Sequence, residues 1–467
     1  MTIQSINPAT EEILASFDEL TPAQIDRALD AAAATFERWR HTSFAERSGL
    51  MRHAAAYLRQ GKARLAKLIT QEMGKPVVEA EAEIEKCAWN CDFYAENAER
   101  FLAHVPVKTD ATESYVAFEP LGAILAIMPW NFPFWQLFRF AAPALMAGNV
   151  ALLKHASNVP QCALAIEEFF RAVGFPEDAF QTLLVPGPAA EALIEDERIQ
   201  AVTLTGSDST GAKVAQAAGR AIKKTVLELG GSDPFIVLAD ADLEAAAETG
   251  IRARNQNTGQ SCIAAKRFIV VQGVADQFEQ MLVERTGNLR VGDPMLRETQ
   301  VGPLARGDLR DALESQVQRS VELGAHIAVG GRRPHGPGYF YAPTVLTGVT
   351  PDMPGACEET FGPVAAVIRV NNEDEAIAVA NSTRFGLGAS LWTRDIGRAR
   401  ALARELQAGS VFVNGMVASD PRLPFGGTKR SGYGRELSEF GIREFVNVQT
   451  VWIGPRAGGA ASPSPAE

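Results

Sequence analysis

The sequence predicts an α/β protein built from two domains with parallel sheets, and three observations lead to this prediction. Short apolar runs alternate with helical segments between residues 123 and 229, and a second series of the same kind extends from residue 234 to residue 415. Such alternation is typical of right-handed βαβ units around a buried parallel sheet. The chain has 467 residues, 46% hydrophobic and 22% charged, which suits an ordinary globular protein of two or three domains.

The first hundred residues are predicted to be helical. Thr21, Pro22 and Gln24 form the start of a capping box, and apolar residues follow them at helical spacing. Ser43 and Glu46 open a second helix in the same way.

Ten apolar runs are the predicted strands of the two sheets. They cover residues 123–128, 150–154, 180–185, 201–206, 225–229, 234–239, 267–273, 364–370, 389–393 and 410–415. The apolar stretch 121–153 is long enough to span a bilayer, but its three prolines and Asn131 divide it into a strand, a turn and a helix. We therefore expect a buried α/β element there and no membrane span.

Charge and cysteine content exclude several classes of protein. A formal net charge of -11 argues against a surface for nucleic acid or anionic membrane. The chain has only five cysteines, and an odd, sparse set does not suit a disulfide framework. The N-terminus also lacks the pattern of a secretory signal, so we expect the protein in a reducing cytoplasm. Cys87 and Cys91 lie four residues apart on a predicted helix without a second pair of ligands, which favours a packed helix face over a metal site.

Three short segments carry candidate chemistry, and each has a simpler explanation. Cys262 follows the turn-forming residues 257–259, although a lone cysteine is more often a small buried hydrophobe. Glu228 lies in an apolar strand, where it is either a general base with a raised pKa or a strand-end side chain in solvent. Gly206 and Ser207 follow a strand and open a helix, which suits a phosphate, yet a plain turn needs the same residues and no G-x-G-x-x-G or Walker motif is present.

Five motifs in the right order resemble the aldehyde dehydrogenase superfamily over nearly the whole chain. They are PWNFP at 129–133, LELGGSDP at 227–234, NTGQSC at 257–262, EETFGPV at 358–364 and PFGGTKRSGYGRE at 424–436. The resemblance implies that the Cys262 thiolate attacks an aldehyde and that Asn131 and the Cys262 backbone N–H hold the oxyanion. Glu228 would then activate the water that hydrolyses the thioester. No metal is implied.

The resemblance also implies a nicotinamide cofactor and the residues that contact it. Those residues are Trp130, Lys154, Ser157, Gly206, Ser207, Leu229, Gly230, Glu359 and Phe361. Many NAD-preferring relatives carry Glu three residues after the lysine, whereas this chain has Ser157. A neutral side chain there removes the repulsion against a 2′-phosphate, so we expect NADP to be preferred and NAD to be accepted.

Within the superfamily the chain is most similar to bacterial NAD(P)-dependent succinate-semialdehyde dehydrogenases. Arg139, eight residues after Asn131, and Ser419 match residues that bind the substrate carboxylate in those enzymes, and Arg422 adds charge nearby. Gln256 stands where several relatives have a second arginine, so the carboxylate clamp is weaker or differently built. Another small ω-carboxy or aliphatic aldehyde, such as glutarate semialdehyde, stays an alternative substrate.

The resemblance implies an NAD(P)-binding domain, a catalytic domain, a small β arm for oligomerisation and a disordered tail. The predicted NAD(P)-binding domain covers residues 1–103 and 120–229, and the catalytic domain covers residues 230–444. The predicted arm covers residues 104–119 and 445–453, and the tail covers residues 454–467. A homodimer or homotetramer is expected. Two other classes stay open: a cofactor-independent cysteine hydrolase and a non-catalytic relative.

Overall fold

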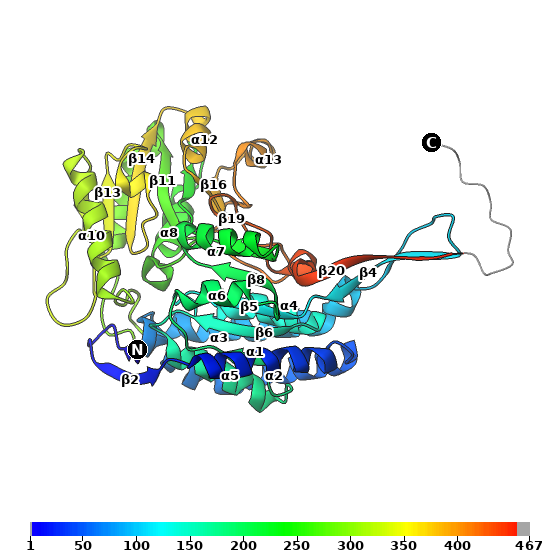
Figure 1. Cartoon of the computed structure of the whole chain (residues 1–467). Helices are drawn as coiled ribbons and strands as arrows, with labels where there is room; N and C mark the ends of the chain where they lie inside the picture. The colour runs from blue at the N-terminus through cyan, green and yellow to red at the C-terminus, as the bar shows by residue number, and fades with distance from the viewer. Residues whose placement is uncertain (1, 455–467) are drawn as a thin grey trace.

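The computed structural model describes residues 2–454 and contains two α/β halves and a projecting β arm (Figure 1). The α/β fold with two largely parallel sheets is as predicted. Of the predicted tail 454–467, all but Gly454 lies outside the described residues.

The first sheet has the strand order β19-β9-β8-β5-β6-β7 and is parallel except for β19. Its strands are β5 (Ala123–Met128), β6 (Val150–His155), β7 (Phe180–Thr182), β8 (Ile199–Thr205), β9 (Lys224–Glu228) and β19 (Gly432–Tyr433). The predicted strand at 180–185 is therefore shorter than expected. Strand β19 comes from the C-terminal part of the chain, so the two halves are joined through this sheet as well as in sequence.

Seven helices belong to this first half. They are α1 (Pro22–Trp39), α2 (Phe44–Met73), α3 (Val77–Phe101), α4 (Trp135–Ala147), α5 (Pro160–Val173), α6 (Ala189–Glu195) and α7 (Asp208–Arg220). The capping boxes at Thr21 and Ser43 are confirmed. Cys87 and Cys91 are buried on α3 in the core of this half, as the packed-face interpretation predicts.

The order of the strands places a ligand crevice between β5 and β8. From β5 the chain moves to β6 and β7 on one side, and then returns to place β8 and β9 on the other side. Where the order reverses in this way, the connections leave the carboxyl ends of neighbouring strands in opposite directions and open a crevice. The segments that begin at Pro129 and at Gly206 border this crevice.

The second sheet has the order β12-β13-β14-β11-β10-β16-β17, in which only β12 is antiparallel to its neighbour. Its strands are β10 (Asp233–Val237), β11 (Ala265–Val271), β12 (His326–Val329), β13 (Thr344–Thr347), β14 (Val364–Val370), β16 (Gly388–Trp392) and β17 (Ser410–Val413). Alternate residues of β10 and β11 belong to two different hydrophobic clusters, because successive side chains of a strand point to opposite faces.

Helices cover both faces of the second sheet. One face packs on α8 (Leu243–Asn255) and α9 (Gln272–Gly287), and the other on α10 (Gly307–Glu322), α11 (Pro354–Cys357), α12 (Glu373–Asn381) and α13 (Ile396–Glu405). Short elements complete the half: β15 (Phe385–Gly386), β18 (Thr428–Lys429), α14 (Ser438–Ile442) and the 3₁₀ segments Gln256–Gly259 and Arg443–Phe445.

The N-terminus corrects the expectation that the first hundred residues are helical. Strands β1 (Thr2–Ile6) and β2 (Ile13–Asp18) form an antiparallel pair before α1. Ile3 and Ser5 point inward on β1, and the Ser5 hydroxyl donates to the buried Glu72 carboxylate at 2.6 Å. The strand is thus stabilised by a tertiary contact with α2. Only two of its five residues are buried, so its alternation of buried and exposed residues is too short to predict a strand from the sequence.

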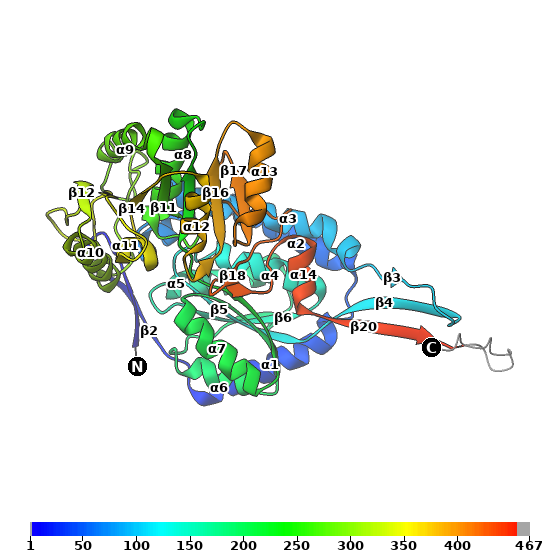
Figure 2. The same ribbon diagram turned by 90° about the horizontal axis from the view of Figure 1, so that it is seen from above.

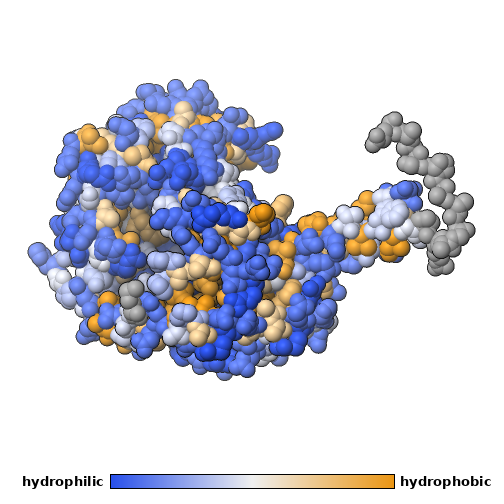
Figure 3. All heavy atoms as spheres, in the orientation of Figure 1, coloured by the Kyte–Doolittle hydropathy of each residue, from blue (hydrophilic) through white to orange (hydrophobic). Residues whose placement is uncertain are grey.

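The arm is a three-stranded sheet that extends away from the body (Figures 1 and 2). It consists of β3 (Val105–Pro106), β4 (Glu113–Pro120) and β20 (Val446–Ile453), and β4 pairs with β20 along its whole length. Hydrophobic residues are visible along the arm in Figure 3. Val448 and Trp452 of β20 are exposed. Among the helices of residues 2–454, none is long and apolar enough to cross a membrane.

Candidate active site

A first cavity lies at the carboxyl ends of β5, β8 and β9. It has a volume of about 260 Å³ and includes eight of the predicted catalytic and cofactor residues in its lining. They are Trp130, Asn131, Gly206, Ser207, Leu229, Gly230, Glu359 and Phe361, together with the nucleophile candidate Cys262. The structure thus brings together residues from four motifs that are far apart in the sequence.

Two predicted cofactor residues lie at the end of β6 and not in this cavity lining. The Lys154 side chain is half-buried, and burial lowers the pKa of its ammonium group. Ser157 is exposed three residues further on. Between them, the buried His155 contacts the Pro133 carbonyl through Nε2 at 3.0 Å, and burial lowers its pKa to about 4. A neutral imidazole therefore fixes the PWNFP turn beside the strand that carries Lys154.

Cys262 follows a left-handed turn that precedes β11. Asn257, Thr258 and Gly259 have φ angles of 59°, 57° and 73°, a rare run of positive values. A Cβ on Gly259 would lie 2.5 Å from the Gly362 carbonyl oxygen, so only glycine fits there. The Glu79 carboxylate accepts the Asn257 backbone N–H at 2.6 Å. This buried network explains how a strained turn is maintained directly before the nucleophile.

The Cys262 thiol is protonated at neutral pH in this conformation. Burial raises the pKa of the thiol to about 12, although Arg139 and Lys266 act to lower it. The Lys266 ammonium group donates to the Cys262 carbonyl at 2.8 Å and to the Glu359 carboxylate at 3.1 Å. It therefore connects the nucleophile turn to the first cavity. Because the thiolate is the reactive form, catalysis requires a group that removes the proton.

Asn131 presents a side-chain amide at the bottom of the same cavity. It is 3% exposed, and its Nδ2 donates one hydrogen to the Gln260 carbonyl at 3.1 Å. Its backbone carbonyl accepts Asn257 Nδ2 at 2.8 Å. An amide nitrogen carries two hydrogens, so a second one is available to a ligand in this cavity.

Glu228 is buried at the end of β9 and lines neither cavity that contains Cys262. Its side chain lies against Gly426, and neither carboxylate oxygen has a hydrogen-bond partner among the described residues. Burial and the neighbouring Glu436 raise the pKa of this carboxyl group well above its usual range, while Arg139 opposes them. The raised pKa favours the protonated carboxyl group in this position, outside the lining of both cavities.

Arg139 lies in the wall of a second cavity of about 390 Å³, but its charge is already paired. Its Nε is 2.6 Å from a Glu436 carboxylate oxygen, and both side chains are at most 3% exposed. Its Nη2 also contacts the Thr205 hydroxyl at 3.4 Å. The expected carboxylate-binding arginine therefore serves first to neutralise a buried glutamate next to Glu228.

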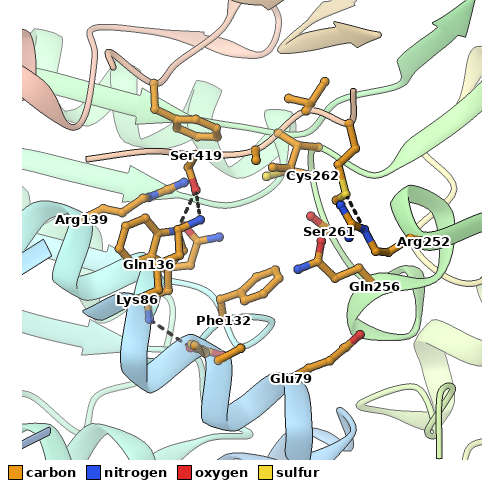
Figure 4. Close-up of a pocket in the computed structure, with 18 residues that line it drawn as sticks. Glu79, Lys86, Phe132, Gln136, Arg139, Arg252, Gln256, Ser261, Cys262 and Ser419 are labelled. Carbon is orange, nitrogen blue, oxygen red and sulfur yellow. Dashed lines mark hydrogen bonds between the residues drawn. The ribbon is translucent and has the colours of Figure 1, made fainter. Parts of the chain in front are cut away.

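Cys262, Gln256 and Ser419 also line the second cavity (Figure 4). Figure 4 shows Ser419 and Cys262 in the upper part of the view and Gln256 below and to the right of Cys262. Arg422 does not line this cavity; its exposed guanidinium pairs with Asp420 at 2.6 Å. The structure thus brings four of the five substrate and nucleophile candidates together and leaves Arg422 outside.

Three functional candidates were missed in the sequence: Glu79, Lys86 and Lys266. Glu79 and Lys86 line the second cavity from α3, and Lys266 lies next to Arg267 in the buried strand β11. Glu79, Glu83 and Lys86 recur at intervals of four and three residues, which places them on one helix face. This spacing of charged residues could have indicated a polar helix face that lines a site. A solvent-exposed helix face shows the same spacing, so the spacing alone does not distinguish the two.

Comparison with known proteins identifies relatives over almost the whole chain. The model of the aldehyde dehydrogenase family matches residues 1–451. A probable succinate-semialdehyde dehydrogenase [NADP(+)] from Synechocystis sp. is 56% identical, covering 97% of this chain and 100% of that protein. Succinate-semialdehyde dehydrogenase [NADP(+)] 1 of Mycobacterium tuberculosis is 52% identical with the same coverage.

Solved structures agree with the sequence relatives. The succinic semialdehyde dehydrogenase of Streptococcus pyogenes, determined with NADP+, has a TM-score of 0.95 at 38% identity, covering 97% of this chain and 100% of that chain. Betaine aldehyde dehydrogenase of Staphylococcus aureus, determined with NAD+, has a TM-score of 0.94 at 30% identity, covering 99% of this chain and 94% of the other. On the evidence of its motifs, its two cavities and these relatives, the chain belongs to the aldehyde dehydrogenase family.

Proposed function

We propose that the protein oxidises succinate semialdehyde to succinate with NADP as the preferred cofactor. The observation that supports this most directly is that Cys262 lines both cavities, one at the crevice of the first sheet and one facing Lys86 and Ser419. Hydride transfer requires an aldehyde and a nicotinamide to meet at one atom, and a nucleophile at the junction of two cavities provides that meeting point.

The first chemical step is addition of the Cys262 sulfur to the aldehyde carbon. The thiol proton passes to solvent water as the C–S bond forms, and the π bond of the carbonyl group breaks. Its oxygen becomes an oxyanion that the free Asn131 N–H and the Cys262 backbone N–H stabilise. A donor of this kind contributes about 10²–10³ in rate. When bound, the nicotinamide supplies the acceptor for the hydride, and the carbon bonded to sulfur becomes a thioester carbonyl.

Deacylation completes the reaction. Glu228 rotates from Gly426 toward the cavity, where its carboxyl group releases its proton to solvent. The carboxylate then takes a proton from water as the water oxygen attacks the thioester carbon. The C–S bond then breaks and releases the acid and the thiolate, which recovers a proton. A raised pKa suits a general base that must bind and release a proton near neutral pH.

The cofactor proposal rests on the residues at the crevice. Gly206 and Ser207 lie at the N-terminus of the 13-residue helix α7, whose free N–H groups suit a pyrophosphate, and Gly206 is open to close approach. The Trp130 and Phe361 rings meet edge to face at 5.7 Å across the cavity. Lys154 offers a cation to the 2′-phosphate of NADP, and the neutral Ser157 places no repelling carboxylate beside it. The NADP(+)-dependent relatives support the same preference.

The site assignments, the domain boundaries and the assembly are parts of the same proposal. We assign the cofactor half to residues 1–103 and 120–229 and the catalytic half to residues 230–444. The arm, with its free strand edges and exposed apolar residues, supports a homodimer or homotetramer. The five cysteines are all free thiols, which supports a reducing cytoplasm as the location.

The test is kcat/KM from nicotinamide reduction for succinate semialdehyde and for butanal, its uncharged four-carbon counterpart, with NADP and with NAD. We expect a preference of about ten- to a hundredfold for the charged substrate, because a charge-assisted contact contributes about 1.5–3 kcal/mol. Equal rates for the two aldehydes would remove the substrate assignment and leave the oxidation chemistry. Turnover without a nicotinamide cofactor would favour a cysteine hydrolase.

A further inference from the structure

Lys86 is a cation in the wall of the second cavity without a carboxylate partner. Its Nζ donates to the Ser419 hydroxyl oxygen at 2.8 Å and lies 4.6 Å from the centre of the Trp135 ring. Within residues 2–454, no carboxylate oxygen lies within ion-pair distance of it. An ammonium group has three hydrogens, so two of them remain for a ligand.

The other cations around this cavity are less suitable. Arg139 pairs with Glu436 at 2.6 Å, and Lys75, below the cavity, pairs with the buried Glu83. Arg252 lies at the exposed rim, where its Nε contacts the Met416 sulfur at 3.2 Å. Solvent screens a charge at the rim, whereas Lys86 is largely withdrawn from water and a contact to it contributes more.

Ser419 is prepared to donate a hydrogen bond into the same space. Its oxygen accepts both the Lys86 ammonium group and the Trp135 Nε1–H at 3.1 Å (Figure 4). A hydroxyl has two acceptor positions and one hydrogen, so both acceptor positions are filled. No acceptor for the Ser419 hydrogen is present in the described part of the chain, which leaves that hydrogen for an anion in the cavity.

We propose that Lys86 Nζ and the Ser419 hydroxyl form the subsite that binds the distal carboxylate of an ω-carboxy aldehyde, with Lys86 as its charged partner. The inference rests on the proposed function, because it assigns the group that selects the substrate at that site. Arg139 then acts behind this subsite, through Glu436. Gln256, on the side of Cys262, contributes no charge.

The ionisation of Lys86 gives the subsite a pH dependence. Burial, with a smaller contribution from Arg139, lowers the pKa of this ammonium group to about 8, while Cys87, Asp420 and Glu83 act to raise it. Above that pH the free enzyme loses the charge that attracts the carboxylate. The preference for a charged aldehyde should therefore decline as the pH rises from 7 to 9.5, whereas a residue that stays protonated would keep it constant.

The experiment measures the ratio of kcat/KM for succinate semialdehyde to that for butanal, with NADP. Lys86→Met should lower this ratio by roughly tenfold to a hundredfold. Lys86→Arg should retain most of the ratio and remove its decline between pH 7 and 9.5. Lys62→Met is the matched control, because this lysine lies on α2 at 3.7 Å from Glu85 on the surface, and it should leave the ratio unchanged. Arg252→Met tests the rim cation and should lower the ratio by less than Lys86→Met.

The outcomes separate this inference from the proposed function. A wild-type ratio near one would refute the substrate class itself. If the wild-type ratio is high and Lys86→Met leaves it unchanged, the role of Lys86 is refuted and the substrate class stands. If Arg252→Met lowers the ratio more than Lys86→Met does, Arg252 at the rim is the main cation for the carboxylate. If Lys86→Met fails to fold, the wild-type pH profile still decides, since a ratio that is constant up to pH 9.5 contradicts the inference.

Discussion

The ion pair between Arg139 of the first half and Glu436 of the second offers the sharpest test of how the two halves are held together. We consider Arg139→Met, which keeps an unbranched apolar stem and removes the guanidinium group with its charge. The variant leaves Glu436 without its cation and removes the positive charge nearest to Glu228. Breaking a buried pair in this way typically costs about 3–5 kcal/mol, because the remaining charge is unpaired.

This cost can be converted into a melting temperature. The entropy of unfolding is about 2.1 cal/mol/K per residue, so 467 residues unfolding in one step give about 1 kcal/mol/K. Arg139→Met should then lower Tm by about 3–5 °C at pH 8. Arg220→Met is the control, since it breaks an exposed pair with Glu195 at 3.2 Å and should cost less than about 1 kcal/mol.

The loss should depend on pH, and its sign follows from proton binding. Glu228 and Glu436 both have raised pKa values in the folded protein, so the folded state binds protons more tightly than the unfolded state. Their contribution to stability therefore decreases as the pH rises from about 4.5 through the folded pKa values. Without Arg139 both pKa values rise further, so the Tm deficit should be larger at pH 8 than at pH 5.

Differential scanning fluorimetry at the two pH values measures this deficit, and the pH profile of kcat gives a second measurement. The acidic limb of that profile should move to higher pH in Arg139→Met, because Glu228 must be ionised to act as a base. A Tm deficit below 1 °C, or one that is equal at pH 5 and pH 8, would refute the reasoning. If Arg139→Met loses activity with succinate semialdehyde and not with butanal, Arg139 binds the substrate carboxylate directly.

Three further predictions concern the cofactor residues and the nucleophile. Ser157→Glu should lower the ratio of kcat/KM with NADP to that with NAD by about tenfold or more, because a carboxylate repels the 2′-phosphate; an unchanged ratio in steady-state assays would contradict the assignment. Gly230→Ala should weaken NADP binding measured by fluorescence titration, since a Cβ there would lie 2.2 Å from Glu359 Oε2, and wild-type affinity would show that the cofactor lies elsewhere. Alkylation of Cys262 by iodoacetamide should accelerate about tenfold per pH unit from pH 7 to 9, since its thiol pKa is about 12, and a plateau in that range would show a lower pKa.

Sequence alone determined the elements that depend on local pattern. The capping boxes at Thr21 and Ser43, ten strands of the two sheets and the turn before Cys262 follow from residues that are close together in the chain. The sheet strands β12, β13 and β19 were not predicted. The resemblance to the family implied that Asn131 and Cys262 hold the same oxyanion, and both residues line one cavity.

What only the tertiary structure decided is which charges meet. The Lys86 ammonium group bonds to a hydroxyl 333 residues away, and Arg139 pairs with Glu436 from the opposite end of the chain. No spacing or periodicity relates such positions, since they approach only when the helices of one half pack against the last turns of the other. A buried charge must find a partner or a ligand, but its sequence neighbours do not show which. The fold thus left Lys86 without a carboxylate partner in the described residues and paired Arg139 with Glu436, and the sequence indicated neither arrangement.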